Sequence, residues 1–306
     1  MINSVDNNNN NNQSKLSVFY SICSTCNRRC SYCMNKIDKY SYKKQDTYYK
    51  LILDKIDSIN KPIHLDITGG EPTTYNKFSN LITYISKMKN IERLILSTNG
   101  NSAFNWNAIV QDIHSIPNNL IVLTIHLENE DPLIIGNTLT SLSLYNLNVE
   151  VRIPYLSNYL DRISQLVKIL SKYNLYKLLV LPIYSDKIKY TEEDYYNINK
   201  LNNKIGINEE EPYLPDTKNK YCVSAGINIS PDGKWSKCLT SEKSQLPIYL
   251  YTNEDILENV VQKCPNNKCF FLSENHLIFD TFEEANEYKD KEVCHIQHKS
   301  SLIRAM

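Results

Sequence analysis

Three cysteines near the start of the chain have the spacing of a metal-binding loop. Cys26, Cys30 and Cys33 form a CxxxCxxC pattern. Thiolates on one short loop can converge on a compact metal centre, and both zinc and iron–sulfur clusters are held by thiolates. Three protein ligands leave one coordination position open for a substrate or a cofactor. The spacing therefore indicates a metal centre that takes part in chemistry.

A second segment, Thr68-Gly69-Gly70-Glu71-Pro72, follows a predicted strand. Two adjacent glycines allow a ligand to approach the main chain closely, and Pro72 stiffens the exit from the turn. Glycine is scarce in this chain, with 7 among 306 residues. Where glycine occurs in such a chain, we expect the backbone geometry to require it.

The elements that position these segments are predicted from hydrophobic patterns. Apolar residues at three- and four-residue spacing, such as Tyr48, Leu51, Ile52 and Ile56, predict helices between β-branched runs. Strands alternating with helices favour parallel βαβ units wound as a barrel or an open sheet. The six predicted strands are 15–22, 62–68, 93–97, 120–127, 149–153 and 178–183.

The chain divides into three predicted parts. Residues 1–14 include an asparagine run with nothing apolar to bury, which predicts a disordered tail. Residues 15–205 contain the six strand and helix units. Residues 206–306 hold five of the nine cysteines and form a small second domain.

The overall charge supports neither a nucleic-acid partner nor a membrane-surface partner, although local patches remain possible. Lys+Arg and Asp+Glu are 34 each, so no overall field favours nucleic acid or a membrane surface. The chain has no apolar run long enough to span a membrane and does not begin as a signal peptide does. We therefore expect a cytoplasmic protein whose cysteines are reduced, which favours metal ligation over disulfides.

Polar residues alternate with aliphatic ones inside the predicted strands. Glu150 and Arg152 share one face of the fifth strand, and a barrel would turn that face inward. Charged groups are rarely buried unless paired, so they indicate a polar, partly wet cavity. A guanidinium binds carboxylates in a bidentate manner, which makes Arg152 a candidate for a carboxylate of a cofactor. The alternative is that the two residues pair structurally or are solvated.

Together the cysteine pattern, Tyr32 before its last cysteine, and the Gly69-Gly70-Glu71-Pro72 segment resemble the radical S-adenosylmethionine (radical SAM) enzymes. The resemblance implies a partial (β/α)6 TIM-like barrel over residues 15–205. It also implies a [4Fe–4S] cluster on Cys26, Cys30 and Cys33 that binds S-adenosylmethionine. In that family one electron cleaves the cofactor, and the resulting 5′-deoxyadenosyl radical abstracts hydrogen from a substrate.

The same resemblance suggests cofactor contacts residue by residue. Many relatives have Ser-Leu-Asp after the fourth strand, whereas this chain has His126-Leu127-Glu128. His126 can still supply a hydrogen bond to the cofactor, or it can be a structural histidine. The contacts implied are Tyr32 to the adenine, Gly69, Gly70 and Glu71 to the methionyl ammonium, Thr98 and Asn99 to the cofactor or substrate, and His126 and Arg152.

The C-terminal cysteines suggest a second metal site. Cys222 and Cys238 flank Gly226 and Pro231-Asp232-Gly233, which predicts a hairpin that brings the two sulfurs together. The segment resembles the opening of the SPASM and Twitch auxiliary domains, and five cysteines fit the single cluster of Twitch. The ligands implied for an auxiliary [4Fe–4S] cluster are Cys222, Cys238, Cys264 and Cys269, with Cys294-His295 as a substitute. A zinc site on the same thiolates is the alternative.

The sequence thus predicts a radical SAM enzyme of the oxidoreductase or peptide- or small-molecule-modifying kind. The implied reductant is a flavodoxin or a ferredoxin, because such clusters require strong reductants. The substrate class is a peptide or a small polar molecule. The rival hypothesis is a non-catalytic zinc-binding or iron–sulfur protein that keeps the fold.

Overall fold

The structure is a computed structural model, and its described residues cover most of the predicted core. The predicted tail 1–14, Cys269 and Cys294-His295 lie outside them. The described residues are 15–33, 42–101, 103–129, 136, 138–140, 142, 145–183, 188–207, 218–224, 226–238, 244–264 and 276–289.

An eight-stranded sheet forms the body of the protein, in the order β6-β5-β4-β3-β2-β1-β8-β9. Its strands are β1 Leu16–Ser21, β2 Ile63–Thr68, β3 Ile91–Thr98, β4 Asn119–Thr124, β5 Val149–Pro154, β6 Lys177–Leu181, β8 Ile227–Ile229 and β9 Trp235–Ser236. Every neighbouring pair from β1 to β6 is parallel. The six predicted strands are therefore confirmed as one parallel set.

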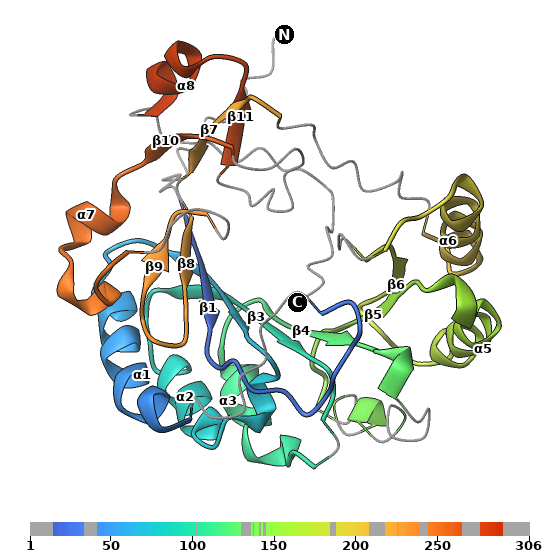
Figure 1. Ribbon diagram of the computed structural model, residues 1–306. Helices are drawn as coiled ribbons and strands as arrows, with labels where there is room; N and C mark the ends of the chain where they lie inside the picture. Colours follow the sequence, from blue (N-terminus) through green and yellow to red (C-terminus); the bar gives the residue numbers. More distant parts are fainter. Residues whose placement is uncertain are drawn as a thin grey trace, which may run out of the picture.

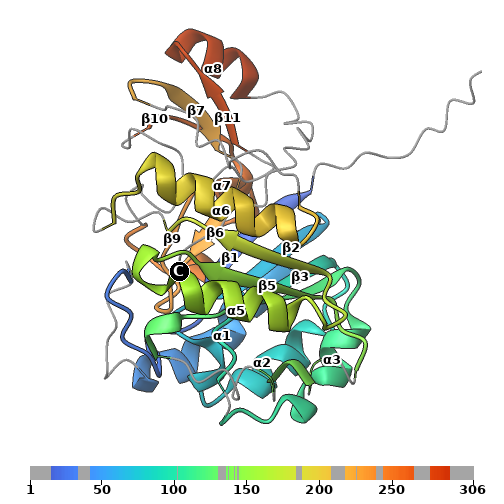
Figure 2. The same ribbon diagram turned by 90° about the vertical axis from the view of Figure 1, so that its right-hand side faces the viewer.

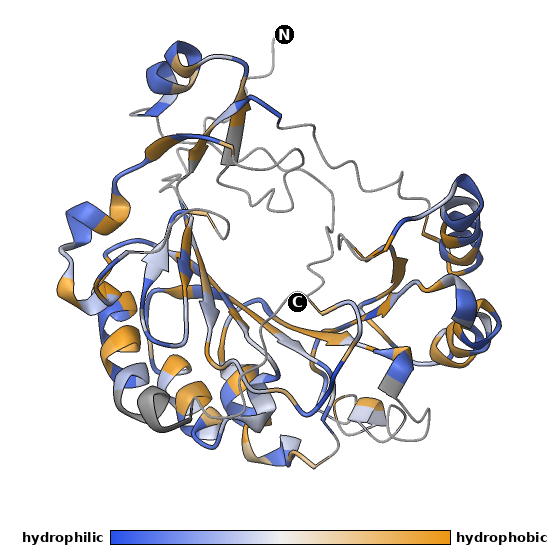
Figure 3. Ribbon diagram, in the orientation of Figure 1, coloured by the Kyte–Doolittle hydropathy of each residue, from blue (hydrophilic) through white to orange (hydrophobic). Residues whose placement is uncertain are grey.

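Helices cover one face of this sheet (Figure 1). They are α1 Tyr42–Asp57, α2 Phe78–Ile85, α3 Val110–Ser115, α5 Leu160–Leu170 and α6 Glu192–Lys204. Aliphatic residues of the strands and helices form one large buried cluster. Figure 3 colours the hydrophobic residues of these elements orange. The strands form an open arc, so the α/β fold is a partial, unclosed barrel, as the sequence predicts.

The fourth strand is shorter than predicted. It ends at Thr124, and a 3-10 helix, η3 Leu127–Asn129, follows where the sequence pattern predicted strand as far as Leu127. Apolar residues continue to alternate past the strand end because Ile125 and Leu127 remain buried. The alternation therefore reports burial here and not extended pairing.

The two outer strands of the six-stranded parallel set, β6 and β1, are covered by different means. On β6, the Asn202 side chain of α6 accepts from Val180 N–H and donates to Val180 C=O, both at 2.9 Å. On the other side β8 pairs in parallel with β1, placing Val18 opposite Ile227. Part of the segment 206–306 thus extends the sheet of the core. Protected edges disfavour pairing with other chains.

A smaller sheet, in the order β10-β7-β11, uses the rest of the C-terminal segment. Its elements are β7 Tyr221–Ser224, β10 Val260–Lys263, β11 His276–Phe279 and the helix α8 Phe282–Lys289. The short helix α7 Asn253–Leu257 precedes β10. Figure 2 shows this sheet and α8 standing beyond the rim of the large sheet. Among the described residues, no helix is long and apolar enough to cross a membrane.

Candidate cluster and cofactor site

The cysteine loop begins where β1 ends and remains tied to the end of β2. Ile22 N–H donates to Thr68 C=O at 2.8 Å, which continues the pairing of the two strands. Beyond the strands, Gly70 N–H donates to Cys23 C=O at 2.8 Å and Glu71 N–H donates to Thr25 C=O at 2.7 Å. The two motifs found in the sequence are thus one hydrogen-bonded unit.

The two glycines of this unit are required by close backbone packing. A Cβ at Gly70 would lie 2.1 Å from the Thr25 carbonyl oxygen, and one at Gly69 would lie 2.5 Å from that of Cys23. Gly69 also has a φ of +151°. No side chain fits at these distances. The close contact between the loop and the end of β2 therefore explains why a chain with few glycines has two of them here. Contact of these glycines with a cofactor stays a prediction.

Glu71 is buried and joins the ends of β2 and β3. Its Oε1 accepts from Thr73 N–H at 3.1 Å, from Thr73 Oγ1 at 2.6 Å and from Thr98 Oγ1 at 2.7 Å. Its Oε2 accepts from Asn99 N–H at 2.6 Å. Burial raises the pKa of Glu71, and these hydrogen bonds oppose the rise. The carboxylate is thus engaged within the protein, and its predicted role toward the methionyl ammonium stays a prediction.

Asn99 connects the end of β3 to the first cysteine of the pattern. Its Nδ2 donates to Cys26 Sγ at 3.7 Å and to Asn27 Oδ1 at 2.8 Å. Cys26 Sγ also accepts from the backbone N–H of Arg28 at 3.4 Å. Asn99 Oδ1 is buried without a hydrogen-bond partner among the described residues. An unpaired buried acceptor is costly, so it fits a donor that a bound cofactor would supply.

The three cysteines of the CxxxCxxC pattern are less buried than their neighbour Cys23. Cys23 is fully buried, and its Sγ donates to Glu71 C=O at 3.4 Å, so it is a thiol packed at the end of β1. Cys26, Cys30 and Cys33 form no disulfide and are only partly buried. Burial raises the pKa of Cys30 to about 11, so a metal must displace its proton. No three His, Cys, Asp or Glu residues in the described part of the chain are already arranged around a single ion.

The third cysteine is preceded by two residues that contact the end of β4. Tyr32 is buried, and its hydroxyl lies 2.8 Å from His126 Nδ1. Burial, together with the positive charge of Arg28, lowers the pKa of His126 to about 3, so the imidazole is neutral at neutral pH. Ser31 contacts Glu128. His126 is therefore engaged with the residue predicted to meet the adenine.

The predicted inward face of β5 carries an ion pair. Arg152 Nε donates to Glu150 Oε1 at 2.5 Å, and the side chains are 14% and 5% exposed. This is the pairing that the sequence left as an alternative. The contact uses Nε alone, so the terminal amino groups of Arg152 have no hydrogen-bond partner among the described residues. A paired guanidinium with a free end can still bind a carboxylate.

Two C-terminal cysteines share a face of the small sheet. Cys222 on β7 lies opposite Gln262 on β10, and Cys264 N–H donates to Lys220 C=O at 2.9 Å. Residues opposite each other, and residues two positions along, lie on one face. Cys222 and Cys264 are therefore diagonal neighbours on the face opposite that on which Val223 packs against α8. Beside them, Gln262 Nε2 is buried with no partner within the described residues.

The hairpin predicted between Cys222 and Cys238 is wrong in its extent. The antiparallel pair is β8 with β9, in which Ile229 lies opposite Trp235. Cys222 belongs to β7 of the other sheet, because the chain leaves that sheet before Ile227 and joins β1. The turn at Pro231-Asp232-Gly233 is present, with Gly233 at a φ of +80°. This turn does not pair the two cysteines.

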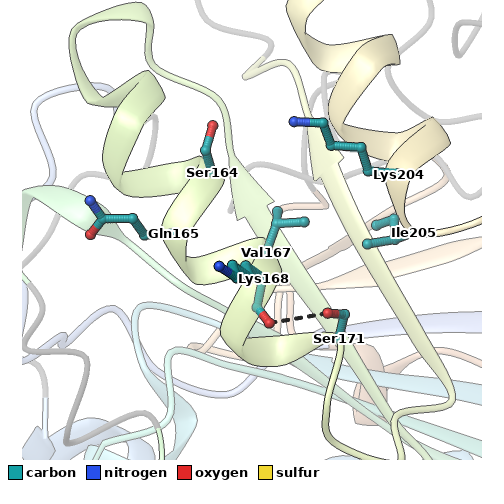
Figure 4. A pocket seen from close by; sticks show the side chains of 7 residues that line it. All are labelled: Ser164, Gln165, Val167, Lys168, Ser171, Lys204 and Ile205. Atoms are coloured by element: carbon teal, nitrogen blue, oxygen red, sulfur yellow. Dashed lines mark hydrogen bonds between the residues drawn. The ribbon is translucent and has the colours of Figure 1, made fainter.

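A cavity of about 450 Å³ lies elsewhere, between α5 and α6 on the outer layer (Figure 4). Within it, Ser171 Oγ donates to the Lys168 carbonyl oxygen at 3.2 Å. Its lining residues are Ser164, Gln165, Val167, Lys168, Ser171, Lys204 and Ile205. None of these belongs to the motifs found in the sequence.

Sequence reasoning assigned no role to Ser31, Glu128 or Gln262, although polar Glu128 alternating with His126 was a usable signal.

Several solved structures have a similar fold, and two of them were determined with S-adenosylmethionine bound. Streptococcus suis SuiB bound to S-adenosylmethionine superimposes with a TM-score of 0.56 at 14% identity, over 80% of this chain and 64% of SuiB. SuiB bound to its precursor peptide SuiA gives 0.56 at 13% identity, over 80% and 65%. Native anSMEcpe with bound AdoMet gives 0.56 at 17% identity, over 79% and 81%. This chain thus matches slightly less than two thirds of these two SuiB structures.

Sequence comparison gives the family directly. No curated protein sequence matches the chain significantly. Residues 20–182, more than half of the 306, match the radical SAM superfamily. The match spans the cysteine loop, the Gly69-Gly70-Glu71 segment, the end of β1 and all of β2 to β6. The chain therefore belongs to the radical SAM superfamily.

Proposed function

We propose that this protein is an enzyme in which Cys26, Cys30 and Cys33 hold a [4Fe–4S] cluster that binds S-adenosylmethionine. The observation that carries the proposal is the loop itself. It carries three partly buried cysteines outside any disulfide, and it is anchored to the ends of β2 and β3 through Gly70, Glu71 and Asn99. A preorganised loop lowers the conformational cost of closing three ligands on one centre.

When bound, the cluster supplies the electron that cleaves the sulfonium of S-adenosylmethionine, and the radical released takes hydrogen from the substrate. The residues of this chain bind and orient. Asn99 Oδ1 would accept from the cofactor, and the free end of Arg152 would bind its carboxylate. The same site would be lined or supported by the other residues that the resemblance implies, namely Tyr32, Gly69, Gly70, Glu71, Thr98 and His126.

We further propose an auxiliary [4Fe–4S] cluster on Cys222, Cys238, Cys264 and Cys269. The shared face of Cys222 and Cys264 supports it, as does the unpartnered Gln262 Nε2 beside them. A cluster with thiolate ligands is negatively charged, and hydrogen bonds to its sulfurs tune its potential. Cys269 lies outside the described residues. The small sheet carrying two of the other three proposed ligands agrees with a SPASM- or Twitch-like domain at 206–306.

The proposed substrate is a peptide or a small polar molecule. SuiB has been solved with a precursor peptide, and anSMEcpe with a peptide as well. In this chain the inner face of the arc is polar and partly exposed at Asp66, Ser97, Thr124 and Arg152. The proposed reductant is a flavodoxin or a ferredoxin, and the proposed location is the cytoplasm.

Anaerobic reconstitution tests the proposal. The wild-type protein should take up about eight irons, four for each [4Fe–4S] cluster. With dithionite and S-adenosylmethionine it should release 5′-deoxyadenosine. Cys26→Ala should lose this activity and about four irons, whereas Cys23→Ala, three residues away but buried and outside the pattern, should keep both. Cys238→Ala should lose about four irons and keep the cleavage of the cofactor.

Colourless protein loaded with zinc would contradict the proposal and support the non-catalytic rival. Equal loss of iron and activity in Cys26→Ala and Cys238→Ala would contradict the division into two clusters. Comparing peptides and metabolites with and without active enzyme would then identify the substrate.

A further inference from the structure

Two consecutive residues of the cysteine loop are held by two residues that follow β4. Glu128 accepts from the backbone N–H of Ser31 at 2.8 Å through Oε2, and from the Ser31 hydroxyl at 2.6 Å through Oε1. His126 meets the Tyr32 hydroxyl at 2.8 Å, with the two rings stacked at 5.9 Å between centroids. The contacts join segments more than ninety residues apart in the chain.

These contacts lie between two of the proposed cluster ligands. Ser31 and Tyr32 are the two residues between Cys30 and Cys33. Within this stretch, Cys33 N–H donates to Cys30 C=O at 3.1 Å, which closes a single turn. The side chains of His126 and Glu128 therefore supply, from outside the loop, the fixation that regular secondary structure would provide elsewhere.

The segment that holds the loop is itself anchored. Arg162 on α5 donates from Nη1 to Leu127 C=O at 3.0 Å, between the two holding residues. Leu127 is buried in the main core, and His126 is 9% exposed. A carboxylate that accepts two hydrogen bonds from one residue restricts that residue in orientation as well as in distance. The end of β4 can thus transmit the rigidity of the sheet to the loop.

We propose that His126 and Glu128 are positioning residues that set the relative placement of Cys30 and Cys33 for the cluster. The inference rests on the proposed function, since it assumes that these cysteines hold the cluster. It differs from a direct contact with the cofactor, because both oxygens of Glu128 are already engaged by Ser31. It also explains how His126-Leu127-Glu128 serves the site where relatives have another sequence.

The first arm of the test uses the full-length protein without metal. Hydrogen exchange over residues 30–33 reports whether the Ser31 amide is protected by Glu128. In Glu128→Ala this amide should exchange about tenfold faster, since a hydrogen bond to a charged group is lost. Glu92→Ala, which removes an exposed partner of Lys15, is the matched control and should change nothing there.

The second arm uses the reconstituted protein without S-adenosylmethionine. Glu128→Ala should lose iron to a chelator about fivefold faster than wild type, with a changed electron paramagnetic resonance spectrum of the reduced cluster and a nearly unchanged unfolding midpoint. Ser31→Ala should show part of the effect, and the double variant should be no worse than Glu128→Ala. Glu128→Gln, which keeps one acceptor, should be intermediate. Tyr32→Phe and His126→Phe should resemble each other.

Unchanged iron release in Glu128→Ala, together with weaker binding of S-adenosylmethionine, would overturn the inference in favour of direct cofactor contact. Additive effects of Ser31→Ala and Glu128→Ala would also overturn it. A wild-type protein that takes up no iron would overturn the proposed function and this role with it. That failure is distinguishable, because the exchange of the Ser31 amide would still depend on Glu128.

Discussion

The two cysteine regions of this protein are positioned by opposite means. The loop carrying Cys26, Cys30 and Cys33 has no regular structure, and three strand ends hold it: β2 through backbone N–H groups, β3 through the Asn99 side chain and β4 through the Glu128 side chain. Cys222 and Cys264 instead lie on or next to paired strands, where register alone puts them on one face. A short sheet backed by one helix is marginal by itself. We therefore expect the first region to be organised before metal binds, and the second to depend on the proposed auxiliary cluster for much of its stability.

The largest expected effect comes from a substitution that disrupts the packing of the first region. Gly70→Ala places a methyl group 2.1 Å from the Thr25 carbonyl oxygen, and backbone cannot move aside as a flexible side chain can. We expect a loss of about 3 kcal/mol or more in the free energy of unfolding, measured by urea denaturation. The control is Gly206→Ala, which has a φ of +78° but open space, and should cost only about 1 kcal/mol. Equal costs would show that Thr25 is not packed against β2 as described.

Glu71→Gln tests whether side chains unite the strand ends of the first region. Both carboxylate oxygens accept from a backbone N–H, one from Thr73 and the other from Asn99. An amide in either orientation turns its NH₂ toward one of these donors. We expect a loss of about 2 kcal/mol in the free energy of unfolding, because a buried donor is left unpaired. Glu92→Gln, on an exposed ion pair, should change the same measurement by less than about 0.5 kcal/mol.

These particular residues also show what the sequence could and could not predict. The six parallel strands and the cysteine loop followed from alternation and spacing, which are local properties. The bond from Glu128 to Ser31 crosses 97 residues, and no local pattern encodes it. The hairpin between Cys222 and Cys238 was wrong because the pairing of Ile227 with Val18 competes for the same chain. The sequence singled out Glu71 and Gly70 for contact with a cofactor, which stays a prediction, but their contacts within the protein depend on tertiary packing and no local pattern indicated them.

Removing the metal should separate the two regions directly. In the metal-free protein, the amides of Gly70 and Glu71 should remain protected from hydrogen exchange, since Cys23 and Thr25 accept from them. The amides of β7 and β10 should exchange about tenfold faster than in the reconstituted protein, because a metal bound only by the folded state stabilises it. Cys222→Ala should reproduce the faster exchange in the presence of iron. Equal protection of β7 and β10 with and without metal would contradict the comparison.

The smallest expected effect concerns a single donor in the second region. Gln262 lies opposite Cys222, and its buried Nε2 has no partner among the described residues, so a bound cluster would receive its hydrogen bond. Gln262→Leu should leave the stability of the metal-free protein unchanged or slightly higher, because an unpaired polar group is removed. The loss of a hydrogen bond worth about 1 kcal/mol should lower the midpoint potential of the C-terminal cluster by about 40 mV.

A redox titration followed by electron paramagnetic resonance measures this shift. Gln165→Leu on the outer layer is the control and should leave both potentials unchanged. A shift confined to the cluster on Cys26, Cys30 and Cys33 would place Gln262 near the wrong centre. A shift in neither cluster would mean that Gln262 supplies no hydrogen bond to the second cluster. The two regions would then differ in this respect as well, because Asn99 donates a hydrogen bond to Cys26 in the first.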